Sequence, residues 1–185
     1  MKSALYTAIA MVTATGTANA TDWRVVPEDS TLGIIGLLNG APFEGAFLEY
    51  DTSISFDPDD PSSATIDVVI DTGSLDTDNE QRDNTARGSD LFSVAEYPTA
   101  QFTASGFAAQ GDDAYVTEGQ LTIRDVTQEV TLPFTLTING DRAHAVGELA
   151  INRIDFGVGR GQWASSDPVA HEITVTIDIV AEATN

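Results

Sequence analysis

The chain has 185 residues, of which 42% are hydrophobic, and it contains no cysteine. Its 29 acidic residues outnumber eight basic ones, which gives a formal net charge of −21. The apolar content excludes a disordered acidic segment, and the negative charge makes nucleic acids and anionic membrane surfaces poor partners. Without cysteine, thiol catalysis, iron–sulfur clusters and Cys-ligated zinc are also excluded.

The first twenty residues have the pattern of a secretory signal peptide. Lys2 precedes an apolar run at residues 4–12 that is too short to span a bilayer, and Ala18-Asn19-Ala20 is an A-x-A cleavage site. We expect residues 1–20 to be removed and residues 21–185 to form a single periplasmic or secreted domain without stable membrane insertion. Lys2 is the only lysine, so this mature chain carries seven arginines against 29 acidic residues and has a net charge of −22.

From residue 23 onward, alternating apolar and polar residues predict a chain made almost entirely of β-strands. Asn39-Gly40 and Asn139-Gly140 are strong signals for tight hairpins. About eight or nine closely spaced strands with short turns favour an antiparallel barrel or a sandwich. The predicted strands cover residues 23–26, 31–38, 43–56, 64–70, 99–109, 113–123, 126–138, 142–151 and 169–180.

One insertion, at residues 76–98, has a different character. Thr77 and Glu80 have the spacing of a capping box, and Arg87 is placed in the last turn, where the helix dipole favours a cation. Gly88 is predicted to end the helix in the left-handed conformation. The pattern therefore predicts a short helix over residues 78–87.

Motifs of catalysis and metal binding are weak. Asp155-Phe156-Gly157 spells the metal-binding triplet of protein kinases, but the chain lacks the kinase lysine and H-R-D loop. His144 and His171 lie on different predicted strands at no ligand spacing, and the sequence contains no G-x-S-x-G elbow. We therefore predict neither a metal site nor an enzyme.

Several short motifs follow one another along the chain in a fixed order. They are Trp23 with Ser30, Gly45-x-Phe47, Ile54-Ser55-Phe56-Asp57-Pro58, Arg82-Asp83, Leu91-Phe92, Tyr97-Pro98-x-x-x-Phe102, Gly119-x-Leu121-Thr122-Ile123, Val130-x-Leu132-Pro133 and Arg153-x-Asp155-Phe156-Gly157. Their order and spacing resemble the YceI-like, polyisoprenoid-binding family over nearly the whole mature chain. The chain departs from the usual family pattern at Val26, Asp29 and Asn84, so no role that depends on the family's histidines at the last two positions is expected.

The resemblance implies an all-β fold, a lipocalin-like antiparallel β-barrel of about eight strands with a short helical insertion. It also implies an exported carrier of a polyisoprenoid or similar long-chain amphiphile, with no cofactor other than a bound lipid or quinone. Alternatives are a prenyl-quinone-binding partner of a membrane b-type cytochrome, or an enzyme or stress protein that acts on an amphiphile in the same fold. The sequence leaves open whether the protein forms a homodimer.

A carrier of this type needs an elongated apolar cavity, which we expect to open near the insertion. Arg82, Arg153 and Arg160 are candidates to bind a pyrophosphate head group, and we expect Arg82 to pair with Asp83 or Asp78. A neutral quinone head group is the alternative, since it meets less repulsion from an acidic protein. The predicted ligand-binding residues are Phe43, Phe47, Arg82, Phe92, Tyr97, Phe102, Leu121, Phe134, Arg153, Phe156 and Trp163.

Overall fold

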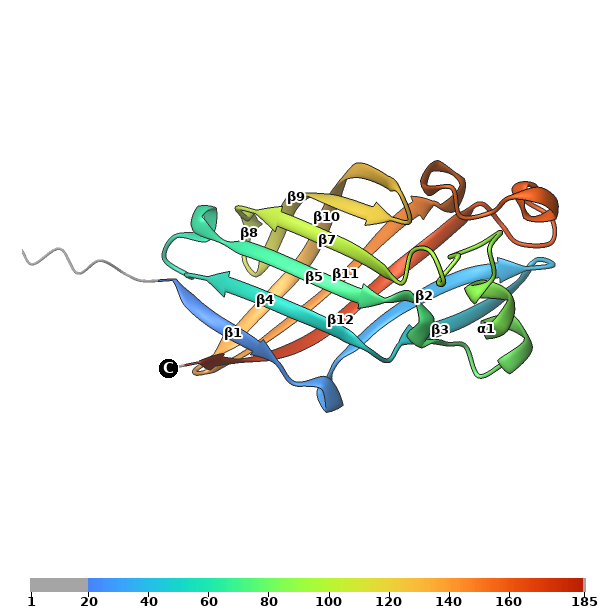
Figure 1. The fold of residues 1–185 in the computed structure, drawn as a ribbon. Helices are drawn as coiled ribbons and strands as arrows, with labels where there is room; N and C mark the ends of the chain where they lie inside the picture. The colour runs from blue at the N-terminus through green and yellow to red at the C-terminus, as the bar shows by residue number, and fades with distance from the viewer. Residues whose placement is uncertain (1–19, 185) are drawn as a thin grey trace, which may run out of the picture.

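The computed structural model describes residues 20–184 and shows a closed antiparallel β-barrel with one α-helix (Figure 1). Residues 1–19 of the predicted signal peptide lie outside the described residues. The helices are α1 (Glu80–Arg87) and five 3-10 turns, η1 (Pro27–Asp29), η2 (Pro61–Ser63), η3 (Thr72–Ser74), η4 (Arg153–Phe156) and η5 (Gly161–Ala164). The strands are β1 (Thr21–Val25), β2 (Thr31–Leu38), β3 (Ala41–Phe47), β4 (Tyr50–Phe56), β5 (Thr65–Asp71), β6 (Leu75–Asp76), β7 (Thr99–Ser105), β8 (Ala108–Gly111), β9 (Ala114–Ile123), β10 (Val126–Asn139), β11 (Arg142–Asn152) and β12 (Glu172–Thr184).

Eight strands form the ring of the barrel, in the order β1-β4-β5-β7-β9-β10-β11-β12, and β12 pairs back with β1. Beyond η1, β2 continues the course of β1 along β12, β3 pairs with β2, and β6 pairs with β3. The chain is therefore an up-and-down meander that removes sheet edges by closing on itself. This confirms the predicted barrel of about eight strands and settles the choice against a sandwich.

The predicted strand at residues 43–56 is divided into β3 and β4 at Leu48 and Glu49. Their backbone N–H groups donate outside the ladder, to the carbonyl and the hydroxyl oxygen of Ser74. Gly45, where a bulge was expected, instead pairs in regular register with Ile34. The bend therefore arises after the glycine, where η3 takes over the backbone hydrogen bonds.

The helix of the insertion begins two residues later than predicted, at Glu80. Its N-cap is Asn79, whose side chain accepts a hydrogen bond from a first-turn N–H, so the predicted capping box of Thr77 is wrong. Thr77 instead donates both its backbone N–H and its hydroxyl to the buried carboxylate of Asp83. Gly88 has φ −65° and ψ 163°, so the helix ends without the predicted left-handed residue.

The seam of the barrel lies where β1 gives way to β2 beside β12. The chain leaves the sheet at η1, and the hydroxyl of Ser30 fills the gap in the ladder. The hydroxyl oxygen accepts a hydrogen bond from Val180 N at 3.0 Å, and the hydroxyl O–H donates to Val26 O at 2.7 Å. One side chain thus replaces the strand-to-strand bonds that η1 removes.

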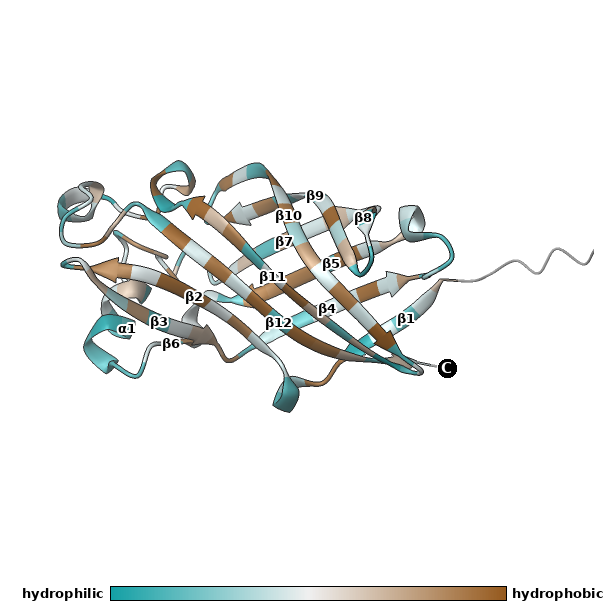
Figure 2. Cartoon of the chain, turned by 180° about the vertical axis from the view of Figure 1, so that it is seen from behind, coloured by the Kyte–Doolittle hydropathy of each residue, from teal (hydrophilic) through white to brown (hydrophobic). Residues whose placement is uncertain are grey.

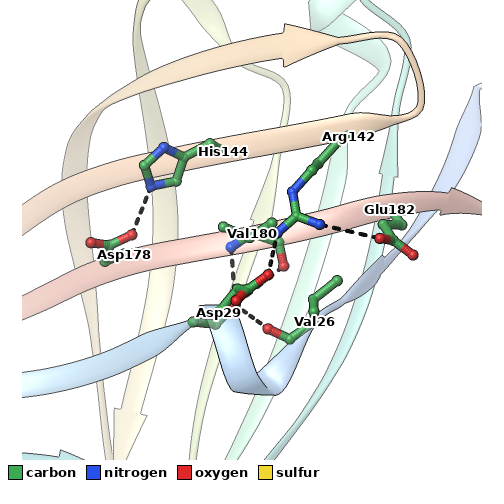
Figure 3. A network of polar contacts seen from close by, with 8 residues as sticks. Val26, Asp29, Arg142, His144, Asp178, Val180 and Glu182 are labelled. Atoms are coloured by element: carbon green, nitrogen blue, oxygen red, sulfur yellow. Dashed lines mark hydrogen bonds and ion pairs between the residues drawn. The ribbon is translucent and has the colours of Figure 1, made fainter.

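Polar side chains also pair on the outer surface near the same seam (Figure 3). Arg142 on β11 pairs with Asp29 of η1 and with Glu182 of β12, and His144 Nε2 lies 2.7 Å from Asp178 Oδ1. About half of each side chain is exposed, so each of these pairs contributes only about 0–1 kcal/mol. The half-buried Ser30 bonds therefore matter more for the seam than these exposed pairs.

Replacing Ser30 with alanine is expected to lower the free energy of unfolding by about 1–3 kcal/mol, because Val180 N is left without an acceptor. Urea unfolding measures the change. Ser53→Ala is the matched control, since Ser53 is exposed on β4, and it should change stability by less than about 0.5 kcal/mol. Equal effects of the two substitutions would contradict the role of Ser30 at the seam.

Candidate functional site

The barrel encloses an apolar cavity of about 560 Å³. Its volume lies within the roughly 300–1,000 Å³ typical of small-molecule sites. Side chains from every strand of the ring contribute, because alternate residues point inward; Figure 2 shows the resulting hydropathic bands along β11 and β12. On β12, for example, Ile173, Val175, Ile177 and Ile179 all line the cavity.

The two ends of the cavity differ in chemistry. Most of its polar lining residues belong to α1, the segment before it, or η4; they are Thr77, Asn79, Gln81, Arg82, Thr85 and Arg153. Asn79 and Gln81 are exposed, so the cavity opens at this end. At the far end Trp23, Phe56 and Phe107 line it and are at most 8% exposed. The cavity is therefore a tunnel with a polar mouth beside α1 and a closed apolar end.

The structure brings nine of the eleven predicted residues together around this tunnel: Phe43, Phe47, Arg82, Phe92, Phe102, Leu121, Phe134, Arg153 and Trp163. Tyr97 and Phe156 are not among the lining residues. The Tyr97 ring lies 5.3 Å from the guanidinium carbon of Arg124, and Phe156 is buried in the core cluster next to the mouth. Both pack against loops that shape the tunnel and do not face its interior.

Many aliphatic lining residues were not in the predicted set, among them Ile34, Ile54, Val68, Leu149 and Val175. The sequence did contain a signal for them, because they occupy the apolar positions of alternating strands. A predicted set made mainly of aromatic residues, with Leu121 its one aliphatic member, therefore missed most of the tunnel wall. The same alternation would have extended the set to every strand of the ring.

Arg82 projects from α1 at the mouth and is held by uncharged partners. Its Nε donates to Thr77 Oγ1 at 2.7 Å, its Nη2 donates to the Thr77 carbonyl, and its guanidinium lies 4.9 Å from the centre of the Phe43 ring. The expected ion pair with Asp83 or Asp78 is wrong, since the Thr77 hydroxyl stands between Arg82 and Asp83. Nη1 of Arg82 takes no part in these bonds and can bind a polar group of a ligand.

Arg153 is only 4% exposed and has no carboxylate partner within the described residues. Burial lowers the pKa of its guanidinium. Its nitrogens donate five hydrogen bonds of 2.8–3.0 Å, and a guanidinium has five N–H groups. The head-group role predicted for Arg153 is therefore corrected, because no donor is left for a ligand. The acceptors are the carbonyls of Val158, Trp163, Ser165, Val169 and Ala170.

These bonds fix the segment at residues 157–170, which supplies Trp163 and Val169 to the mouth. Gly159 makes the arrangement possible, since a Cβ there would lie 1.9 Å from Arg153 Nη1 and the residue has φ +127°. Two further arginines act similarly. Arg87 donates to the carbonyls of Gly73 and Leu75, before α1, and Arg124 donates to the carbonyls of Ser89 and Leu91, in the loop that follows α1. Three loops at the mouth are thus each held by one arginine.

Replacing Arg153 with methionine is expected to lower the free energy of unfolding by about 2–5 kcal/mol, because five carbonyls lose their donor. Arg153→Lys should recover only part of the loss, since an ammonium has fewer donors. Arg160→Met changes an exposed arginine of the same segment and is the control. Guanidinium chloride unfolding of the three variants measures the difference, and equal losses for Arg153→Met and Arg160→Met would refute the clamp.

The chain is similar in sequence to a known protein family and to individual bacterial proteins. A family model described as the YceI-like domain matches residues 23–181. A UPF0312 protein of Pseudomonas aeruginosa is 34% identical over 165 residues, which cover 84% of this chain and 82% of that protein. Protein YceI of Salmonella newport is 29% identical over 183 residues, which cover 94% of this chain and 93% of that protein.

Solved structures agree with this placement. Burkholderia cenocepacia BcnA superposes with a TM-score of 0.82 at 30% identity, over 85% of this chain and 99% of that one. A polyisoprenoid binding domain from Saccharophagus degradans has a TM-score of 0.67 at 15% identity, over 90% of this chain and 99% of that one, and this likeness concerns the fold alone. Since the family model spans nearly the whole described chain, the protein belongs to the YceI-like family.

Proposed function

We propose that this protein is an exported carrier that binds a polyisoprenoid or a similar long-chain amphiphile inside its barrel. The observation that supports this function is the apolar tunnel of about 560 Å³, which is closed at its apolar end and has a polar mouth beside α1. The structural neighbour from Saccharophagus degradans is called a polyisoprenoid binding domain, so a protein of this fold is already associated with the same class of ligand. Export rests on the A-x-A site that ends at Ala20.

The tunnel wall accounts for binding of a hydrocarbon tail without specific polar contacts. Each CH₂ group that moves from water into an apolar site contributes about 0.8 kcal/mol. Branched aliphatic side chains such as Ile34, Val68 and Ile177 form the wall on several strands. A long tail therefore binds through its buried area, and the polar residues beside α1 keep its head group at the mouth.

The charges at the mouth favour a neutral head group. Arg82 has unbonded N–H groups there, whereas Arg153 has none and Arg160 does not line the tunnel. A pyrophosphate would therefore meet a single available guanidinium on a protein whose mature charge is −22. A prenyl alcohol or prenyl quinone has no charge and loses less binding free energy to electrostatic repulsion. We therefore infer a cargo of that class.

Competition between a prenyl alcohol and the prenyl pyrophosphate of equal tail length tests the head-group preference. The alcohol should bind about tenfold more tightly at low salt, a difference of ~1.4 kcal/mol. The difference in affinity between the two ligands should become smaller as added salt screens the repulsion between the pyrophosphate and the acidic protein. Tighter binding of the pyrophosphate at low salt would contradict the preference while leaving the carrier function intact.

Val175→Asp tests the carrier function itself, because Val175 lines the tunnel on β12 and a carboxylate there would be buried without a partner. Native mass spectrometry of protein from the periplasmic fraction, with a chain that begins at Thr21, should show a bound lipid in the wild type. The variant should lose this lipid.

Val146→Asp is the matched control. Val146 lies on the neighbouring strand β11, is 41% exposed and faces outward, so the same substitution should leave the bound lipid in place. Circular dichroism establishes that both variants are folded. A folded Val175→Asp protein that keeps its lipid, or a wild-type protein that neither carries a lipid nor binds an added prenyl alcohol, would overturn the proposal.

A further inference from the structure

The closed end of the tunnel is built from packed aromatic side chains, which we call the aromatic floor: Trp23, Phe56, Phe107 and Tyr115. The rings of Phe56 and Phe107 stack with centroids 5.3 Å apart, and Tyr115 meets both edge-on at 6.4 and 6.3 Å. Such pairs stabilise a core beyond their buried area. Because Trp23, Phe56 and Phe107 are at most 8% exposed, this end forms a fixed wall.

The aromatic floor suits the end of a hydrocarbon tail. Tyr115 packs against Phe56 and Phe107 but does not line the tunnel. Among the floor side chains that do line it, only Trp23 carries a polar atom, and its Nε1 already donates to the Phe56 carbonyl at 3.3 Å. A hydroxyl or carboxylate at the far end of a ligand would be buried there without a partner, which is strongly unfavourable. The floor therefore selects an amphiphile with one polar end that enters tail first.

The volume of the tunnel next to the aromatic floor depends on the size of the inward-facing side chains of β11 and β12. On β11 the inward residues change from Ile151 and Leu149 near the mouth to Ala145 and Ala143 at the closed end. Ala143 pairs with Ala181 of β12, and both lie in the cluster that contains the floor. Larger side chains at these positions would fill the last part of the tunnel that a tail can occupy.

We propose that the aromatic floor, together with Ala143, Ala145 and Ala181 beside it, sets the maximum tail length of the ligand. This inference rests on the proposed function, because it assumes that the tunnel holds a tail. Tails that end short of the floor gain affinity with each added carbon. Tails that reach it gain nothing from further carbons, which must stay outside the mouth.

A ladder of prenyl alcohols that differ by one isoprene unit tests the limit. In the wild type, affinity should rise by about fourfold for each added CH₂ group and then level off at the length that reaches the floor. Ala143→Leu adds three carbon atoms beside the floor, so the last isoprene unit that the wild type accommodates should no longer fit, and the break should fall one step earlier in the ladder. The shorter alcohols should bind the variant as they bind the wild type.

Leu136→Ala is the opposite change, since Leu136 lines the same end on β10, and it should move the break to longer tails. It also keeps the test valid if Ala143→Leu does not fold. Ala150→Leu is the control, because Ala150 is exposed on the same strand as Ala143, and its break should match that of the wild type.

The outcomes separate the two proposals. If the wild type binds no prenyl alcohol of any length, the carrier function fails and the length limit fails with it. If the wild type binds the alcohols but the folded variants keep the wild-type break, or if affinity rises along the whole ladder without a break, the carrier function stands and the length limit is wrong.

Discussion

The structure depends on a continuous ring of backbone hydrogen bonds around an interior that is not filled. Ordinary domains owe much of their stability to a densely packed core, and a void forfeits those contacts. Here β12 closes the ring by pairing with β11 on one side and with β1 and β2 on the other. The Ser30 hydroxyl completes the ladder where η1 interrupts it. The barrel can therefore keep a tunnel open without losing its shape.

The arginines show how the mouth is held in an acidic protein. With 29 acidic residues available, Arg87, Arg124 and Arg153 nevertheless donate chiefly to backbone carbonyls. Irregular segments leave carbonyls without ladder partners, and a planar group with five donors can satisfy several of them at once. These residues build the rim, and among the arginines that line the tunnel Arg82 has donors to spare for a ligand. The preference for a neutral head group follows from this division of roles.

The aromatic residues are likewise divided between two tasks. Phe102 lines the tunnel and lies over Gly119, where a Cβ would be 2.4 Å from the ring, so the glycine creates the space for the phenylalanine. Phe56, Phe107 and Tyr115 instead pack against one another and close the far end. Packing at one end and openness along the rest place the mouth of the tunnel beside α1.

The sequence by itself determined the all-β class, most strand positions, the helical insertion and the apolar face of each strand, because these depend on local alternation and turn signals. Motif resemblance and the aromatic positions also identified nine of the residues around the tunnel. The division of β3 from β4, the cap of α1 and the partners of Arg82 and Arg153 were decided by tertiary structure. Arg82 and Arg153 look alike in sequence, yet Arg153 meets five carbonyls of one folded loop while Arg82 meets a single threonine. These partners lie within 17 residues of each arginine in the sequence. Which carbonyls a guanidinium meets nevertheless depends on the folded path of an irregular segment, and no alternation or turn signal encodes that path.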